Sequence, residues 1–158
     1  MSEPTHLDAA GRARMVDVSR KPETERRARA ACSVRLGSDA AAAMREGTAG
    51  KGDVAAAARL AGIAAAKRTS DLIPLCHPLR TGAVRVDLAF EDETTLGVTA
   101  EVAGVDRTGF EMEALVAAST AALTVYDMLK AVDKGITITG LRLLEKSGGK
   151  SGPWTRKD

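Results

Sequence analysis

Two neighbouring segments alternate between apolar and polar side chains, and this pattern limits the possible folds more than any other feature of the sequence. An apolar side chain stands at every second position in residues 84–90 and again in residues 96–102. A period of two residues is typical of a strand with one buried face. Because only a short polar connection separates the segments, they are predicted to form an antiparallel hairpin.

A third alternating segment lies nearer the N-terminus. It runs from Ala28 to Leu36, and Gly37 is expected to end it, so it is predicted as another half-buried strand. Ser38 follows in the position of a helix N-cap. A short helix is therefore predicted over residues 39–45, closed by Gly47.

Two longer helices are expected from the rest of the pattern. Asp53 precedes a segment made almost entirely of alanine, which predicts a helix to about Arg68 because alanine is the best helix former. Gly62 in the middle of this helix indicates close approach of another backbone, since glycine there costs about 1 kcal/mol relative to alanine. The second helix is predicted over residues 109–132.

The remaining segments are shorter or less regular. Residues 15–18 are interpreted as a short strand, and the charged residues 20–27 as a solvated loop. A last strand is predicted from Ile136, with a bulge at Gly140 because the apolar positions change phase there.

The order of these elements predicts the fold class. From Ala28 onward it is β-α-β-β-α-β, the ferredoxin-like arrangement of an α+β protein, with helices packed on one face of an antiparallel sheet. The other face is expected to be apolar and to be covered by oligomerisation. We expect a disordered arm over 1–14, one domain over 15–146 and a flexible basic tail over 147–158.

Composition narrows the class of function. The net charge of +2 in 158 residues does not indicate nucleic-acid binding. An RNA-binding module of RRM type shares the element order, but this hairpin offers only Phe90 for base stacking. Two cysteines, Cys32 and Cys76, and the absence of an apolar leader predict a cytoplasmic protein.

Residues 70–79 form the most informative segment for chemistry. Prolines on either side of Cys76 and His77 restrict the backbone to extended conformations. A rigid loop of this kind can present His77 to a ligand, or it can be a structural loop whose histidine bonds to the backbone. Adjacent residues of an extended chain point to opposite sides, so the pair is not expected to act as a dyad. No second Cys/His pair is present, and His6 lies in the N-terminal arm, so no metal site is predicted.

The long helix carries a thin polar stripe. At 100° per residue, its polar side chains fall within an arc of roughly 120°; they are Glu113, Thr120, Thr124, Asp127, Lys130 and Lys134. The stripe is an ordinary solvent face or a functional surface. Asp127 and Lys130 lie one turn apart and can pair, which is one way to arrange proton transfer. Glu113 and Asp127 are about 21 Å apart along the axis, so a single nucleotide could touch both only across two subunits.

Basic residues elsewhere are candidate anion ligands. Lys51 lies in a glycine-flanked loop before a helix, where anions are favoured. Arg26, Lys146 and Lys150 could likewise hold phosphates or serve only as solvated surface charges. The sequence around Lys150 is not a phosphate-binding P-loop, because Leu144 replaces the first glycine and no helix is expected afterwards.

Several stretches, in order along the chain, together resemble one family. They are Met15 to Ser19, Lys51 to Val54, Ala65 to Leu79, Thr108 to Leu115, Tyr126 to Val132 and Leu143 to Gly152. These segments are similar to the MoaC family of cyclic pyranopterin monophosphate synthases, which act in molybdenum cofactor biosynthesis. The segment ending in His77-Pro78-Leu79 and the block Glu111-Met112-Glu113 are the most specific. Phe110 and Arg80-Thr81-Gly82 depart from the usual family pattern.

The resemblance implies an activity and an assembly. It implies a lyase that converts a cyclised dihydroguanosine triphosphate, supplied by a partner radical enzyme, into cyclic pyranopterin monophosphate with release of diphosphate. It also implies a ferredoxin-like subunit assembled as a hexamer made of dimers. No cofactor is predicted. A non-catalytic nucleotide-binding paralogue with the same fold is the alternative.

The resemblance also assigns residues. It implies that Asp127 is the active-site residue and that Lys51 and Lys130 take part in acid/base steps. Other residues are implied to bind substrate or to lie around the same pocket, namely Leu75, Cys76, His77, Met112, Glu113, Arg26, Glu111 and Lys146.

Overall fold

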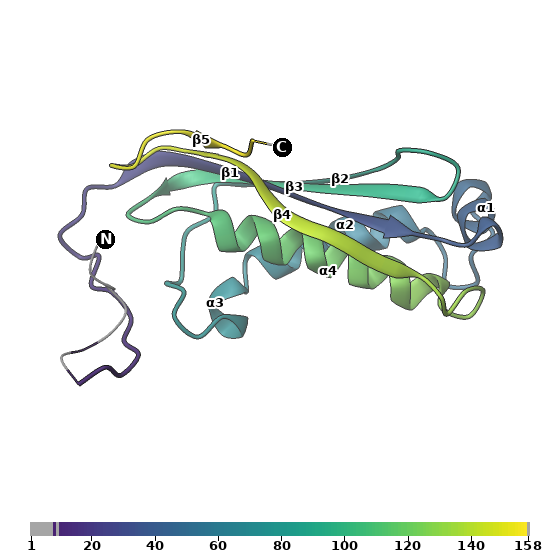
Figure 1. Ribbon diagram of the computed structural model, residues 1–158, viewed down its shortest axis with the longest axis horizontal. Coiled ribbons are helices and arrows are strands. Elements are labelled where there is room, and N and C mark those ends of the chain that lie inside the picture. Colours follow the sequence, from purple (N-terminus) through teal and green to yellow (C-terminus); the bar gives the residue numbers. More distant parts are fainter. Residues whose placement is uncertain (1–7, 9, 158) are drawn as a thin grey trace.

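Five antiparallel strands form one sheet, and the two longest helices lie against one of its faces (Figure 1). The computed structural model describes residue 8 and residues 10–157. The strands are β1 (Thr24–Arg35), β2 (Ala83–Phe90), β3 (Thr95–Asp106), β4 (Thr137–Ser147) and β5 (Trp154–Thr155). The helices are α1 (Ser38–Glu46), α2 (Val54–Ala66), α3 (Thr69–Leu72) and α4 (Glu111–Leu129). The protein is therefore of the α+β class.

The sheet has the order β2-β3-β1-β4-β5, with β1 in the centre. The predicted hairpin is confirmed, because β2 and β3 pair without interruption from Ala83–Ala103 to Phe90–Leu96. Asp92 stabilises its turn, since one carboxylate oxygen accepts from the backbone N–H groups of Thr94 and Thr95 at 2.8 and 2.6 Å. The strand predicted from Ala28 is confirmed as the central strand.

The core lies between the sheet and the helices and is built from small side chains. Strand β1 contributes Ala28, Ala30, Cys32 and Val34, all fully or almost fully buried. Helix α4 buries nine residues, and five of them are alanines. Small side chains allow α2 and α4 to pack closely. The close approach predicted at Gly62 is confirmed, because a Cβ atom there would lie 2.9 Å from the carbonyl oxygen of Ala117.

Helix α4 is long and apolar enough to cross a membrane by length and composition alone. Half of that stretch is buried inside the molecule, where it packs on α2, β1 and β3. Burial against the sheet therefore accounts for its apolar composition.

The bulge predicted at Gly140 is confirmed. Between the pairs Ala31–Arg142 and Ser33–Thr139, β4 has one more residue than β1, and Gly140 has a φ of +65°. Glycine tolerates this left-handed conformation without the steric cost that a Cβ atom would bring.

Some predicted boundaries are wrong at the N-terminal end of the fold. Residues 24–27 belong to β1, because their backbone pairs with residues 103–106 of β3. Residues 15–18 form no strand. Most of the arm predicted over 1–14, including His6, lies outside the described residues.

The start of α1 and the end of α2 differ from the predicted positions. Gly37, not Ser38, is the N-cap of α1, and its backbone N–H donates to Asp133 Oδ2 at 2.7 Å. Gly47 closes α1 with a φ of +68°, as predicted. Helix α2 ends at Ala66, and the separate turn α3 follows it.

The chain after Ser147 also contributes to the sheet. Residues 147–158 were predicted to be a flexible tail, whereas Trp154 and Thr155 pair with Lys146 and Glu145 as strand β5. A reversal through residues 148–152, which contains three glycines with positive φ, makes this pairing possible.

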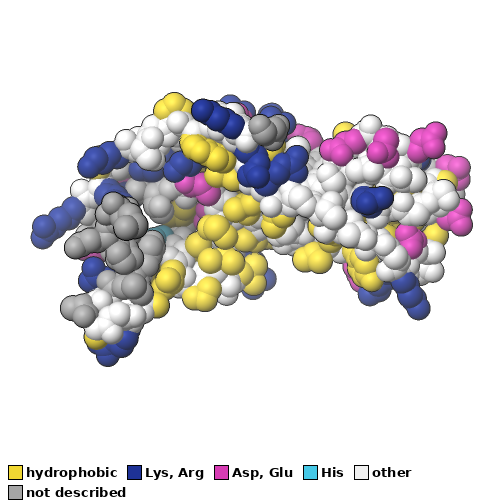
Figure 2. All heavy atoms as spheres, viewed as in Figure 1, with side chains coloured by type: hydrophobic (Ala, Val, Ile, Leu, Met, Phe, Trp, Pro, Cys, Tyr) yellow, Lys and Arg dark blue, Asp and Glu magenta, His cyan; other side chains and the backbone are white. Residues whose placement is uncertain are grey.

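The open face of the sheet is polar, which contradicts the expected apolar face. Its exposed and half-exposed side chains are mainly charged, and they include Arg27, Arg29, Arg85, Asp87 and Glu101. Arg27 and Glu101 pair across neighbouring strands. The most exposed large apolar side chains lie on the helices, namely Leu60 and Leu72 of α2 and α3 and Leu123 of α4, while Val105, Leu141 and Trp154 are exposed on the strands. Figure 2 shows apolar side chains gathered over the helical layer.

Candidate active site

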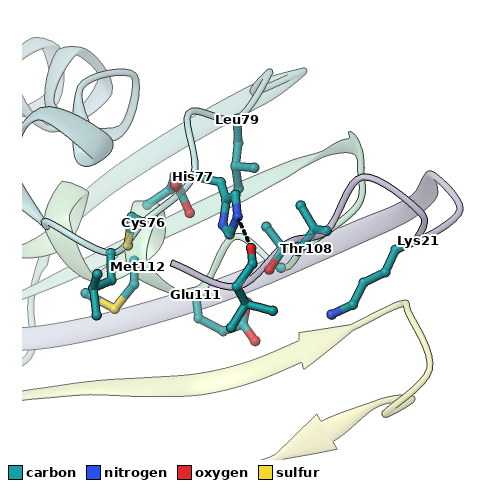
Figure 3. Close-up of a pocket in the computed structure, with 12 residues that line it drawn as sticks. Lys21, Cys76, His77, Leu79, Thr108, Glu111 and Met112 are labelled. Carbon is teal, nitrogen blue, oxygen red and sulfur yellow. Dashed lines mark hydrogen bonds between the residues drawn. The ribbon is translucent and has the colours of Figure 1, made fainter. Parts of the chain in front are cut away.

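A cavity of about 380 Å³ lies where the loop after α3 meets the start of α4 (Figure 3). The loop contributes Leu75, Cys76 and His77, and the helix contributes Glu111, Met112 and Glu113. The N-terminal segment closes another side with Val16, Val18 and Lys21. Six residues that the family resemblance assigns to substrate therefore line one cavity.

His77 is held by the backbone of the N-terminal segment. Its Nε2 donates to the carbonyl oxygen of Val16 at 2.7 Å, drawn as the dashed line in Figure 3. This bond places the proton on Nε2 and leaves Nδ1 as an acceptor in the neutral ring. His77 thus makes the hydrogen bond to the backbone that was expected of a structural loop, and it also lines the cavity. Ile73 is extended before Pro74, as predicted.

Glu113 is the only buried ionisable carboxylate among the described residues, with 3% of its surface exposed. Its pKa is raised to about 7, mainly by burial and to a smaller extent by the nearby carboxylates of Glu111 and Asp106. The carboxyl group faces the cavity, so near neutral pH it can accept or donate a proton there.

Cys76 lies on the same cavity wall beside Met112 (Figure 3). Burial and the neighbouring charge of Glu113 raise the pKa of its thiol. The thiol therefore stays protonated near neutral pH, which disfavours nucleophilic attack.

A larger and more basic cavity of about 830 Å³ adjoins the first. Both are lined by Lys21, Thr108, Gly109 and Glu111, so they form one continuous site. The larger cavity is further lined by Arg26, Arg107, Lys146 and Lys150. Such a concentration of fixed positive charge favours a polyanionic ligand.

Two of these basic side chains are anchored. Arg26 donates from Nε and Nη2 to the carbonyl oxygens of Asp106 and Arg107, at 3.0 and 3.1 Å. Lys146 Nζ lies 2.9 Å from Glu111 Oε1, which ties β4 to the first turn of α4. The Thr24 hydroxyl in the same wall is buried and has no hydrogen-bond partner among the described residues, so a polar ligand or water would satisfy it.

A second group of charges lies at the opposite end of α4. Asp127 accepts from Lys51 Nζ at 2.8 Å through Oδ2 and from Lys130 Nζ at 2.7 Å through Oδ1. Lys51 also donates to the Asp127 carbonyl oxygen at 3.0 Å. These hydrogen bonds from Lys130 and Lys51 lower the pKa of Asp127 to about 2, and the carboxylate raises the pKa of Lys130.

The structure therefore divides the predicted site residues into two groups. Lys51, Asp127 and Lys130 are in direct contact, and the other eight surround the two joined cavities. The two groups lie at opposite ends of helix α4. Glu113 and Asp127 are about 21 Å apart along its axis, because each residue adds about 1.5 Å to the length of a helix. One chain does not bring the two groups together.

Sequence reasoning missed two residues of the site. Lys21 lies in the charged segment that was interpreted as a solvated loop, yet it lines both cavities and points into the site in Figure 3. Arg107 follows β3, and its guanidinium donates to the carbonyl oxygen of Ser19 and also lies 3.7 Å from Glu23. Lys21 is part of the N-terminal segment and Arg107 contacts that segment, whose path has no periodic pattern.

No group of three or more His, Cys, Asp or Glu side chains that could hold a metal ion occurs within residue 8 and residues 10–157. The positive charges of the site are provided by lysine and arginine. These cations can stabilise negative charge on a ligand directly.

Comparison with known proteins identifies relatives over the whole chain. Residues 15–149 match the MoaC family. The protein named cyclic pyranopterin monophosphate synthase from Thermomicrobium roseum is 58% identical, covering 100% of this chain and 96% of the relative. That of Novosphingobium aromaticivorans is 56% identical, covering 98% of each. Cyclic pyranopterin monophosphate synthase 3 of Mycobacterium tuberculosis is 57% identical, covering 98% of this chain and 87% of the relative.

Proposed function

The chain belongs to the MoaC family, and on this premise we propose that it is a cyclic pyranopterin monophosphate synthase of molybdenum cofactor biosynthesis. It is a lyase that converts a cyclised dihydroguanosine triphosphate into cyclic pyranopterin monophosphate and releases diphosphate. A radical enzyme that makes the substrate is its functional partner. The observation that carries this proposal is the contact of Asp127 with two lysines, held in place by α4 and the loop before α2.

The Asp127 group supplies the acid/base chemistry. Rearranging a purine-derived ring requires several proton transfers, and a positioned side chain typically contributes about 10²–10⁴-fold to such a step. Because the pKa of Asp127 is lowered and that of Lys130 is raised, the carboxylate is ionised and Lys130 is protonated. Asp127 therefore carries the negative charge that holds both lysines, and Lys51 and Lys130 are the groups that take part in the acid/base steps.

The basic cavity suits the triphosphate. Formation of the cyclic phosphate expels diphosphate, so negative charge increases on the leaving group and must be stabilised. Arg26 and Lys146 are already fixed by hydrogen bonds, which limits the ordering that ligand binding would require. Lys21 and Lys150 add charge to the same cavity.

The smaller cavity suits the ring system. A guanine-derived ring presents N–H donors along one edge, and the Glu113 carboxyl can accept from them. His77 presents Nδ1 as an acceptor from the facing loop. Leu75, Cys76 and Met112 supply apolar contact around these polar groups, as is usual for a small-molecule site.

The complete site requires a second subunit. A single nucleotide cannot span the roughly 21 Å that separates Glu113 from Asp127 along α4. In a symmetric dimer, the Asp127 group of one subunit meets the cavities of the other. The exposed leucines on α2 and α4 support an interface on the helical side, and the family resemblance implies a hexamer built from such dimers.

The ferredoxin-like fold class and the cytoplasmic location also belong to this proposal. The strand order β2-β3-β1-β4, with two helices on one face, supports the ferredoxin-like class, to which β5 is an addition. Cys32 and Cys76 are both free, which supports a cytoplasmic protein because thiols persist in a reducing compartment.

Diphosphate release from the cyclised nucleotide tests the activity. The parent protein is expected to release one diphosphate for each cyclic pyranopterin monophosphate formed. A protein that binds the nucleotide and releases none would be the non-catalytic paralogue instead.

Mixing two inactive variants tests the shared site. Asp127→Asn damages one end of α4 and Glu113→Gln the other. When both variants are dissociated and reassembled together, one site of each mixed dimer has both native residues, so about a quarter of all sites should recover activity. Mixing without subunit exchange is the control. A site contained within one chain would recover nothing after exchange.

A further inference from the structure

The chain after β4 reverses and returns beside it, and this reversal lies over Arg26. We call residues 148–152 the glycine turn. Strand β5 fixes the far side of the turn, because Trp154 pairs with Lys146 and the backbone N–H of Arg156 donates to the Leu144 carbonyl at 2.8 Å. Within the turn, Gly152 N–H donates to the Gly149 carbonyl at 3.2 Å. The position of the turn is thus set from both sides.

Gly149 lies directly against the guanidinium of Arg26. A Cβ atom at this position would lie 2.3 Å from Nη1 and 2.8 Å from Cζ of Arg26. Real Cβ atoms do not approach other heavy atoms so closely, so any side chain at residue 149 displaces the guanidinium. Gly149 also has a φ of +72°, which disfavours other residues.

The opposite side of the Arg26 guanidinium is also fixed. Nε and Nη2 donate to the carbonyl oxygens of Asp106 and Arg107 at the end of β3. Nη1 makes no hydrogen bond to any described residue and belongs to a side chain that lines the basic cavity. The guanidinium therefore sits between the end of β3 and Gly149, with donors remaining for a ligand.

We infer that Gly149 is a positioning residue, which holds the Arg26 guanidinium where it can donate to a diphosphate group in the basic cavity. The ligand class is a diphosphate or the equivalent part of a triphosphate, because the cavity gathers several cations around this guanidinium. This inference rests on the proposed function for the identity of the substrate. It adds that Gly149, which acts through Arg26, sets anion affinity.

The test compares two glycines of the same turn. Gly149→Ala and Gly152→Ala place the same methyl group at positions with similar φ, +72° and +65°, but nothing lies within 4 Å of a Cβ atom at residue 152. Backbone strain is therefore matched, and only the contact with Arg26 differs. Each full-length variant is titrated with inorganic diphosphate by calorimetry, and KM and kcat are measured with the cyclised nucleotide.

Gly149→Ala is expected to raise both the Kd for diphosphate and the KM by roughly tenfold, which corresponds to the loss of about one charge-assisted hydrogen bond. The value of kcat should change little. Gly152→Ala should leave all three near the parent values. In an Arg26→Ala background, Gly149→Ala should have no further effect on diphosphate binding, because its effect passes through Arg26.

Three results would overturn the inference. They are equal effects of the two alanine variants, an undiminished effect of Gly149→Ala without Arg26, and an Arg26→Ala variant that binds diphosphate as the parent does. If the parent binds diphosphate but does not turn over the nucleotide, the proposed function fails, while the diphosphate titrations still decide the role of Gly149.

Discussion

Gly62 of α2 lies against the backbone of Ala117 in α4, so closely that a Cβ atom at residue 62 would be 2.9 Å from the Ala117 carbonyl oxygen. The same atom would lie 3.0 Å from Val86 of β2 and 3.3 Å from Ala121. This contact sets the spacing of the two helices on the sheet. It therefore also sets where the ends of α4, which bear both groups of site residues, are placed.

Gly62→Ala is expected to destabilise the protein despite the higher helix propensity of alanine. Propensity favours the variant by up to about 1 kcal/mol, but overpacking against a backbone atom typically costs about 1–3 kcal/mol. The midpoint of chemical denaturation should fall. Gly50→Ala is the control, because nothing lies within 4 Å of a Cβ atom there. A stabilised Gly62→Ala variant would show that the helices can separate freely.

Glu113 should make stability decline as pH rises. Its pKa is raised from 4.5 to about 7 in the folded protein, so between these values the folded state holds a proton that the unfolded chain has lost. The contribution is complete below about pH 4.5 and is lost as pH approaches 7, a change of up to about 3 kcal/mol. Glu113→Gln should remove this slope from the free energy of unfolding measured between about pH 4 and pH 8.

The matched control for Glu113 is Glu93→Gln, which changes an exposed carboxyl group in the hairpin turn. Its pH profile should follow that of the parent. An unchanged slope in the Glu113→Gln variant would mean that the carboxyl group is solvated in the folded protein.

Asp127→Asn should lower kcat for diphosphate release by at least about 100-fold, the low end of the contribution of a positioned acid/base group. The amide removes the negative charge that holds Lys51 and Lys130 in place. Circular dichroism and thermal unfolding should stay near the parent, because all three side chains are about half exposed. Asp87→Asn, on the open face of the sheet, should retain full activity; a similar loss in both variants would point to a general effect of charge.

Asp53→Ala should destabilise α2 by about 1 kcal/mol, because the Asp53 carboxylate caps the helix by accepting from the Ala56 N–H at 2.9 Å. Asp53→Asn keeps an acceptor at the cap and should recover most of this loss. Equal destabilisation by the two substitutions would show that the negative charge, and not the hydrogen bond, is responsible.

Regular elements could be predicted wherever the side chains repeat. The hairpin, the central strand and both long helices follow from periods of two and about 3.6 residues, because one face of each is buried. Gly62 and Gly140 could also be interpreted correctly, since a glycine inside a regular element usually marks a close backbone contact or a bulge. Gly37 was missed as an N-cap because its partner, Asp133, lies 96 residues away in sequence.

The site was only partly predictable for the same physical reason. The Asp127–Lys130 pair is local to one helix, so its spacing alone predicts the contact. Lys51 and Lys146 reach Asp127 and Glu111 from distant segments. Their charge and position indicated only possible anion ligands, and the family resemblance indicated their place in the site. Lys21 and Arg107 gave no signal, because irregular backbone carries them to the cavities.

The separation of the two charged groups by the rigid length of α4 has a consequence for how activity varies with concentration. An enzyme whose chemistry is divided between two copies loses turnover when those copies part, even if each remains folded. Specific activity should therefore fall on dilution below the dissociation constant of the proposed dimer and return on concentration, with no change in the circular dichroism of the protein.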